Sequence, residues 1–253
     1  WGNHDIIWMG AAAGHWASIC NVLRMNISYN NFDMLEDGYG INLRVLSEFA
    51  QKVYGDDPCE YFKPKRFDLN RFDPVDDLLA ARMHKAIAIC QFKIEGQRIE
   101  AHPEYELDHR LLLDKIDFKK GTVDIQGKIY EMRDSNLPTV DTENPYQLTK
   151  EEYSMMKAIS LSFKRSKQLQ KHIGFLFSHG SLYSVQNKNL MYHGCIPMDE
   201  NGDFIECTLN NHTSKGKAYM DYLDEQIRKA YYRAKDSEET GYSGDLMWYL
   251  WLG

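Results

Sequence analysis

The sequence predicts a helix-rich α+β fold. Three observations lead to this prediction: apolar residues recur at helical spacing over several long segments, two short alternating segments each surround a polar turn, and a helix-capping pattern precedes one of the periodic segments. Helical segments outnumber the predicted strands, which pair only as local hairpins. No internal repeat or low-complexity segment is visible.

The periodic segments predict five helices. They are expected over residues 6–27, 41–53, about 73–102, from Thr149 onward, and about 215–235. Asp73 and Pro74 are a typical helix start, with an acidic N-cap followed by proline at the first helical position, and Pro103 ends that helix. Thr149 and Glu152 form a T-x-x-E capping box.

The helical spacing also predicts which residues face the core. These are Leu43, Leu46 and Phe49 or Ala50; Leu79, Met83, Ile87, Cys90 and Ile94; Met156, Ile159 and Phe163; and Tyr219, Tyr222 or Leu223, Ile227 and Tyr231. In the first helix, Gly10 and Gly14 flank three alanines, which would let another element approach closely. Hairpins are expected over residues 123–131, around Gln126-Gly127, and over residues 182–192.

Composition narrows the class of protein. The chain has 253 residues, of which 43% are hydrophobic, and a formal net charge of −7 without any basic block. A long polyanion such as nucleic acid is therefore not an expected partner, whereas a small phosphorylated molecule is compatible with this charge. Five unpatterned cysteines indicate reduced thiols and a cytoplasmic protein. Because no apolar run reaches membrane-spanning length, no membrane partner is expected.

Both ends of the chain are expected to be cut points. The chain starts directly on a motif, without an initiator Met, and it stops inside the apolar run at residues 246–252. That run is expected to be part of a helix that ends on exposed tryptophans, which is unusual for a natural domain boundary.

The first candidate site is the motif Gly2-Asn3-His4-Asp5. An amide, an imidazole and a carboxylate follow one another just before the apolar helix. Short tetrapeptides recur by chance, so a simple polar turn that leads into the helix explains this motif equally well.

The second candidate site is His193, which stands at the end of a short apolar strand within residues 189–197. The chain turns sharply at Gly194, and Pro197 stiffens the exit. A neutral imidazole at a strand end is a good ligand for a first-row divalent ion. Taken alone, a histidine satisfied by backbone groups is the commoner interpretation.

Other polar groups are interpreted as structural. A basic stretch could meet a substrate phosphate, but a solvated helix face is favoured; it comprises Lys164, Arg165, Lys167 and Lys171. His84 and His109 have no ligand-like partner at helical spacing and are expected to be surface or satisfied histidines. His179, beside Gly180, is also assigned a structural role.

Together the two motifs resemble the third and fourth signatures of the calcineurin-like metallophosphoesterases. The wider match is more specific, because several segments are similar to class III fructose-1,6-bisphosphatases. These segments are residues 1–14, 178–183, 189–197 and 241–251.

This resemblance implies roles for three residues. Asn3 and His193 correspond to metal ligands, and His4 corresponds to the general acid that protonates the leaving group. In the family, the carboxylate that assists this histidine belongs to an Asp-Arg signature that the chain lacks, and Asp5 is a weaker local candidate for it. The resemblance also implies a two-metal site that holds Mn²⁺. Because the family's first two signatures and a further histidine motif are not in the chain, the site is expected to be incomplete here and the metal weak or absent.

The resemblance likewise implies an architecture. Residues 1–30 and 176–253 would form parts of a metallophosphatase α/β sandwich, and residues 31–175 would form a largely helical cap inserted into it. The whole enzyme would hydrolyse fructose 1,6-bisphosphate to fructose 6-phosphate and phosphate, a reaction of gluconeogenesis. The alternatives are another calcineurin-like phosphoesterase, such as a protein phosphatase or dinucleoside polyphosphatase, or a non-catalytic helical module. A small sugar phosphate is the expected partner, and homo-oligomer formation is left open.

Overall fold

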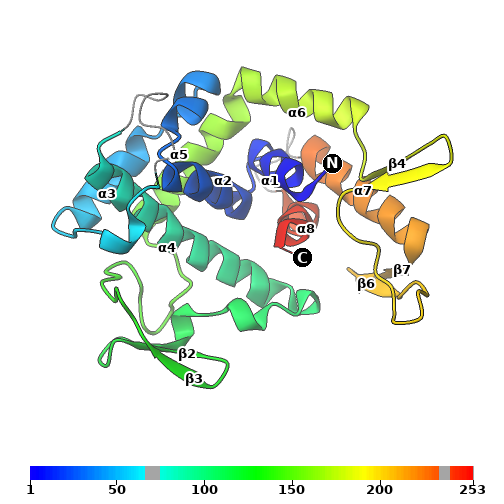
Figure 1. Ribbon diagram of the computed structural model, residues 1–253. Coiled ribbons are helices and arrows are strands. Elements are labelled where there is room, and N and C mark those ends of the chain that lie inside the picture. The colour runs from blue at the N-terminus through cyan, green and yellow to red at the C-terminus, as the bar shows by residue number, and fades with distance from the viewer. Residues whose placement is uncertain (66–74, 234–239, 253) are drawn as a thin grey trace. The chain divides into compact units, whose positions relative to one another are not determined.

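The computed structural model describes residues 1–65, 75–233 and 240–252 (Figure 1). Its long helices are α1 (Asn3–Ala12), α2 (Trp16–Ser28), α3 (Arg44–Tyr54), α4 (Asp77–Ala101), α5 (Lys150–Arg165), α6 (Lys167–His179), α7 (Gly216–Arg233) and α8 (Gly241–Leu252). Single helical turns are found at Met34–Gly38, Glu60–Phe62, Pro103–Tyr105, Asp108–Arg110 and Leu113–Lys115.

The strands are short, and they form three separate antiparallel sheets. They are β1 (Ile116–Asp117), β2 (Thr122–Ile125), β3 (Lys128–Glu131), β4 (Tyr183–Gln186), β5 (Asn189–Tyr192), β6 (Cys207–Leu209) and β7 (His212–Ser214). The predicted helix-rich α+β character is confirmed for the described residues. The calcineurin-like sandwich stays a prediction.

The chain divides into two compact units. One comprises residues 1–19 and 163–253, and the other comprises residues 20–162. The predicted division into residues 1–30 with 176–253, and residues 31–175, has different bounds and stays a prediction. The role of the middle unit as a cap stays a prediction.

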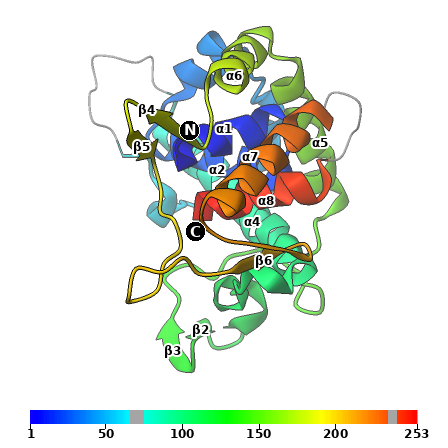
Figure 2. The ribbon, with the colours of Figure 1, turned by 90° about the vertical axis from the view of Figure 1, so that its right-hand side faces the viewer.

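In the unit that contains both chain ends, α1 packs against α6, α7 and α8 (Figures 1 and 2). The side chains at the centre of this packing are fully buried; they include Ile7, Met9, Ile227, Met247 and Trp248. The expectation of exposed tryptophans at the end of the chain is wrong for Trp248. Its helix, α8, is covered by α1 and α7, which is why its apolar composition does not face water.

The predicted single helix over residues 6–27 is also corrected, because it is two helices. α1 ends at Ala12 and α2 begins at Trp16, with Gly14 between them at a φ of +87°. That left-handed conformation favours glycine, so Gly14 ends a helix. Gly10 has the predicted role: a Cβ there would lie 2.5 Å from Ser18 Oγ, so the backbone of α1 can approach this side chain only because Gly10 lacks one.

In the other unit, α3 lies along α4 (Figure 1). Leu46 and Ala50 of α3 are fully buried, as are Ile87 and Cys90 of α4, so the predicted inward faces are confirmed. Asp73 and Pro74 lie outside the described residues. Within them, Asp76 is the N-cap of α4 and its carboxylate accepts the N–H groups of Leu78 and Leu79. The helix ends at Ala101, two residues before Pro103.

The predicted T-x-x-E capping box at the start of α5 is confirmed. Thr149 N–H donates to Glu152 Oε2 at 2.7 Å, and Glu152 N–H donates to Thr149 Oγ1 at 3.1 Å. Downstream, Met156, Ile159 and Phe163 are fully buried, as their spacing predicts.

Both predicted hairpins are confirmed. In the first, Ile125 pairs with Lys128 across the Gln126-Gly127 turn. In the second, Gln186 pairs with Asn189, and Tyr183 pairs with Tyr192 at the open end. Asn187 and Lys188 of the second turn have φ values of +50° and +66°. Such values at both central residues are typical of the tight turn that joins two twisted strands.

Helix α7 confirms the last predicted helix, with Leu223, Ile227 and Tyr231 buried on one face. Lys235, the predicted end, lies outside the described residues. In the described parts of the chain, no single helix is long and apolar enough to cross a membrane. Only α1 and α2 taken together pass that test of length and composition, and a bend of 117° separates them.

Candidate functional site

The structure brings Asn3 and His193 together, although they are 190 positions apart in the sequence. Asn3 is the first residue of α1, and His193 directly follows β5. The Nε2 atom of His193 lies 3.1 Å from Oδ1 of Asn3, within hydrogen-bonding distance. The tautomer with its proton on Nε2 donates to this amide oxygen, whereas the other tautomer keeps the Nε2 lone pair free for a metal ion. The His193 side chain is exposed and Asn3 is half-buried, so both remain accessible to a ligand from solvent.

Gly2 provides the surface on which the imidazole of His193 rests. A Cβ built on Gly2 would lie 3.0 Å from Cγ, Nδ1 and Cε1 of His193. Such a side chain would push the ring away from Asn3. Gly2 has an ordinary extended conformation, with φ −102° and ψ 176°, so the requirement for glycine here is steric.

His4 lies next to Asn3 on the first turn of α1 and is exposed. Its ring meets Trp251 of α8 edge-on, with ring centroids 5.0 Å apart. Consecutive helical residues point in different directions, so His4 does not share the direction of Asn3. The site therefore offers a candidate ligand pair, Asn3 and His193, and beside it the solvent-exposed imidazole of His4.

Asp5 has a local role at the start of α1. Its Oδ2 accepts the backbone N–H of Gly2 at 2.8 Å, which satisfies a donor that precedes the helix. A carboxylate at a helix N-terminus is also favoured by the helix dipole. Among the described residues, no hydrogen bond joins Asp5 to His4, so the structure contains no direct contact for the predicted assistance.

The ligand pair is compatible with one divalent ion. Two ligand atoms about 2.1 Å from an ion and at right angles to each other are about 3 Å apart. The 3.1 Å separation of Asn3 Oδ1 and His193 Nε2 matches that spacing. An amide oxygen and an imidazole nitrogen also suit manganese. Within residues 1–65, 75–233 and 240–252, no group of three or more His, Cys, Asp or Glu could hold a metal ion.

Sequence reasoning missed a buried polar cluster that joins α8 to the start of α2. His15 Nε2 lies 2.9 Å from Asp245 Oδ1, and His15 Nδ1 lies 2.9 Å from Ser18 Oγ. All three residues are buried. The sequence did contain a signal for this cluster, because His15 and Asp245 both stand inside apolar segments. Buried charged groups in proteins are almost always paired, so the two residues could have been expected to contact each other. The contact fixes α8, which carries Trp251, the neighbour of His4.

The remaining candidates behave as structural groups. The basic stretch is divided at Ser166 between α5 and α6, and Arg165, Lys167 and Lys171 are exposed. His84 lies 2.9 Å from the Phe62 carbonyl oxygen, and burial lowers its pKa below the usual value.

Two further histidines also have structural settings. His109 is exposed in a short helical turn. His179 contacts Ser178 Oγ at 2.7 Å and stacks on Phe175. An exposed ring and a ring held by its own helix are the settings expected of structural histidines.

The chain is similar to known proteins over its whole length. Residues 1–253 match the model of a family described as Firmicute fructose-1,6-bisphosphatase. A protein of Clostridium tetani (strain Massachusetts / E88), named fructose-1,6-bisphosphatase class 3, is 51% identical over all 253 residues. Proteins of the same name from Clostridium botulinum strains Okra and Loch Maree are also 51% identical over the whole chain. The chain spans 38% of the length of these curated relatives. No solved structure matches.

Proposed function

This chain belongs to the Firmicute fructose-1,6-bisphosphatase family, and from that premise we propose that the enzyme containing it hydrolyses fructose 1,6-bisphosphate to fructose 6-phosphate and phosphate. The observation that supports this function most directly is the contact between Asn3 and His193. Two motifs 190 positions apart in the sequence place their proposed ligand atoms 3.1 Å apart, a distance that suits one shared ion.

Asn3 and His193 are proposed as ligands of one ion in a two-ion manganese site, and residues outside this chain supply the remaining ligands. Bound manganese would neutralise phosphate charge and acidify a water molecule. Within this chain, the exposed position of His193 leaves room for further ligands around the pair. Gly2 keeps the imidazole against the helix start, so that its Nε2 faces Asn3.

His4 is proposed as the general acid. Hydrolysis forms a bond from a water oxygen to phosphorus and breaks the bond from phosphorus to the sugar oxygen. That oxygen leaves as a poor alkoxide unless it receives a proton, which the protonated imidazole of His4 donates. Two observations support this role: His4 is exposed, and it directly follows a proposed ligand in the sequence. The edge contact with Trp251 limits how far the ring can turn.

The middle unit, residues 20–162, is proposed as the cap. A cap that closes over a small sugar phosphate would exclude water from the reaction, an arrangement that an enzyme acting on a protein surface could not use. Together with the family membership, this favours a small phosphorylated sugar as substrate. The proposed setting is gluconeogenesis in the cytoplasm.

The substitution His4→Asn in the full-length enzyme tests the proposed acid. We expect kcat for fructose 1,6-bisphosphate to fall roughly 10²–10⁴-fold, because proton donation to the alkoxide is lost. The loss should be much smaller for an aryl phosphate, whose phenolate leaves without a proton. Manganese content should stay near the wild-type value. Steady-state kinetics on both substrates and metal analysis provide the measurements.

His172→Asn is the matched control, because His172 is an exposed histidine in the same unit, on α6. It should leave both activities unchanged. If His4→Asn lowered both activities equally and the enzyme also lost manganese, His4 would be a ligand or a structural residue, and its assignment as the acid would be wrong.

A further inference from the structure

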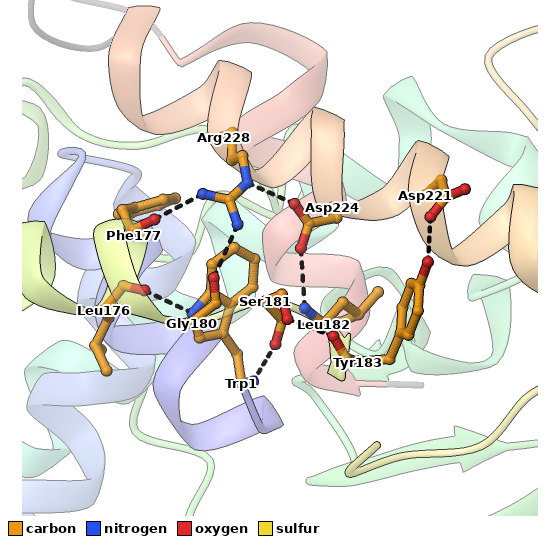
Figure 3. Close-up of polar contacts among 10 residues, drawn as sticks. All are labelled: Trp1, Leu176, Phe177, Gly180, Ser181, Leu182, Tyr183, Asp221, Asp224 and Arg228. Atoms are coloured by element: carbon orange, nitrogen blue, oxygen red, sulfur yellow. Dashed lines mark hydrogen bonds and ion pairs between the residues drawn. The ribbon is translucent and has the colours of Figure 1, made fainter. Parts of the chain in front are cut away.

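We propose that Arg228 is a positioning residue for this site, which holds Asn3 and His193 in register. Arg228 caps the C-terminal end of α6 and packs on Trp1 (Figure 3). The proposal rests on the proposed function of these two residues as ligands of one ion.

The guanidinium of Arg228 uses both its edge and its face. Nη1 donates to the carbonyl oxygen of Phe177 at 2.7 Å, and Nη2 donates to that of Gly180 at 2.9 Å. Nε pairs with Asp224 Oδ1 at 2.5 Å, one turn earlier on α7. The indole ring of Trp1 covers the face, 4.8 Å from the guanidinium carbon. Such a planar fork with a stacked ring is specific to arginine.

These contacts satisfy the end of α6. The last carbonyl groups of a helix have no partner within it and carry partial negative charge. In α6, the carbonyl oxygen of Leu176 accepts the indole N–H of Trp1 at 3.0 Å, in addition to the N–H of Gly180. The neighbouring carbonyl oxygen of Phe177 accepts from Arg228. The guanidinium of Arg228 and the indole N–H of Trp1 therefore supply hydrogen-bond donors that a further turn of helix would otherwise provide.

Through Trp1, this cap reaches one half of the ligand pair. Trp1 is two residues before Asn3, and its ring is held between the guanidinium of Arg228 and the ring of Phe177, which it meets at a centroid distance of 5.6 Å. In this chain, the terminal ammonium group of Trp1 also donates to the carbonyl oxygen of Ser181 at 2.6 Å. The start of α1 is thus attached to the segment that leaves α6.

Through the same segment, the cap reaches the other half of the pair. Asp224, the partner of Arg228, accepts the N–H of Leu182 with its second oxygen at 2.9 Å. Leu182 leads into β4, where Tyr183 is paired with Tyr192, the residue before His193. Tyr183 is also anchored to α7, because its hydroxyl donates to Asp221 Oδ1 at 2.6 Å. Figure 3 shows the contacts of Asp224 with Leu182 and of Asp221 with Tyr183 along α7.

Gly180 makes the arrangement sensitive to a single methyl group. A Cβ built on Gly180 would lie well inside contact distance of Trp1 Nε1, and 2.8 Å from the carbonyl oxygen of Leu176. Its φ of −104° is one that alanine adopts without strain. The substitution Gly180→Ala would therefore displace Trp1 while leaving Arg228 in place, which makes it an independent test of the same cap.

The experiment uses the 253-residue chain in solution, with Mn²⁺ alone as the probe. NMR measures the nuclear Overhauser effect between the Gly2 α-protons and the His193 ring without metal. It then follows the paramagnetic broadening of the Asn3 amide and His193 ring signals as Mn²⁺ is added. In the wild type, the Overhauser effect should be present and the two signals should broaden together.

In Arg228→Lys and in Gly180→Ala, the Overhauser effect should be lost. The Mn²⁺ concentration that broadens the Asn3 amide should rise about 10-fold or more, the usual effect of removing a group that orients a ligand. Lys229→Gln is the matched control. It removes a positive charge from the same helix, α7, and this charge pairs with the exposed carboxylate of Glu225. It should change neither observation. In the full-length enzyme, the two variants should lower kcat more than they raise KM.

Two results would overturn the proposal. One is a folded Arg228→Lys protein, with wild-type circular dichroism, that keeps the Overhauser effect and the wild-type Mn²⁺ response. The other is Gly180→Ala with the same two unchanged observations, which decides the matter if Arg228→Lys does not fold. If the wild-type Overhauser effect is present but the two signals never broaden together, the ligand assignment in the proposed function fails. The positioning role is then judged on the Overhauser effect alone.

Discussion

The substitution Lys85→Met should strongly destabilise the unit formed by residues 20–162. The Lys85 side chain is fully buried, and its Nζ lies 2.6 Å from Asp57 Oδ2 and 2.7 Å from Asp134 Oδ2. Methionine fills most of the same space, but it leaves both carboxylates without their cation. Removing one partner from a buried ion pair costs about 3–5 kcal/mol. We therefore expect the free energy of unfolding at pH 7 to fall by that amount.

The pH dependence of this cost provides a second, more specific signature. Burial raises the pKa of Asp57, but hydrogen bonds from Lys85, from the Cys59 N–H and from Asn136 outweigh it and lower the pKa to about 2. A carboxyl group with a lowered pKa stabilises the folded state above its unfolded value of 3.8. That stability is lost as the pH falls toward 2, and it amounts to about 2 kcal/mol.

Without Lys85, burial dominates and the pKa of Asp57 should rise, so the variant's folded state takes up a proton at a higher pH. The difference in stability between wild type and variant should therefore narrow by roughly 1–2 kcal/mol between pH 7 and pH 4. Urea unfolding of the wild type and of Lys85→Met between pH 7 and pH 4 measures this difference in the free energy of unfolding. Lys52→Met is the control, because the Lys52–Glu151 ion pair is exposed and should contribute less than about 1 kcal/mol. A Lys85→Met cost below that of Lys52→Met, or a cost independent of pH, would refute the reasoning.

Three further predictions concern the capping box, the helix contact and the isolated chain. Thr149→Ala should lower stability by about 1 kcal/mol in urea unfolding, because Glu152 N–H loses its acceptor; an unchanged midpoint would contradict the capping role. Gly10→Ala should cost about 1–3 kcal/mol by thermal unfolding, since its Cβ would lie 2.5 Å from Ser18 Oγ; a stabilised protein would show that this contact relaxes freely. The 253-residue chain with Mn²⁺ should release no phosphate from fructose 1,6-bisphosphate, and turnover would mean that its ligand set is larger than Asn3 and His193.

The elements that sequence alone predicted are those with a local cause. Thr149 and Glu152 are three residues apart and can satisfy each other without any help from the rest of the chain. The Gln126-Gly127 turn and the inward face with Ile87 and Cys90 likewise depend on residues that are close together in the sequence. The prediction of one helix over residues 6–27 was wrong because the apolar run continues across the point where the helix ends. The break occurs at Gly14, whose positive φ is seen only in the structure.

The parts that sequence did not predict depend on contacts between distant residues. Nothing near Trp248 in the sequence indicates that α1 and α7 cover its helix, so exposure was the natural expectation. Arg228 likewise sits in an ordinary amphipathic helix, and its role appears only when the ends of α6 and α1 are placed around it. For the site itself, the motifs nominated Asn3 and His193, and only the fold supplies the 3.1 Å distance between them.

The central claim is that Asn3 and His193 bind the same ion, and a double-mutant cycle in the full-length enzyme tests it most directly. Asn3→Ala, His193→Ala and the double variant are compared by manganese content and by kcat/KM for fructose 1,6-bisphosphate. If both residues hold one ion, each single variant should lose that ion, and the double variant should be no worse than the more impaired single variant. Manganese content that stays at the wild-type value, or losses in kcat/KM that multiply in the double variant, would contradict the claim.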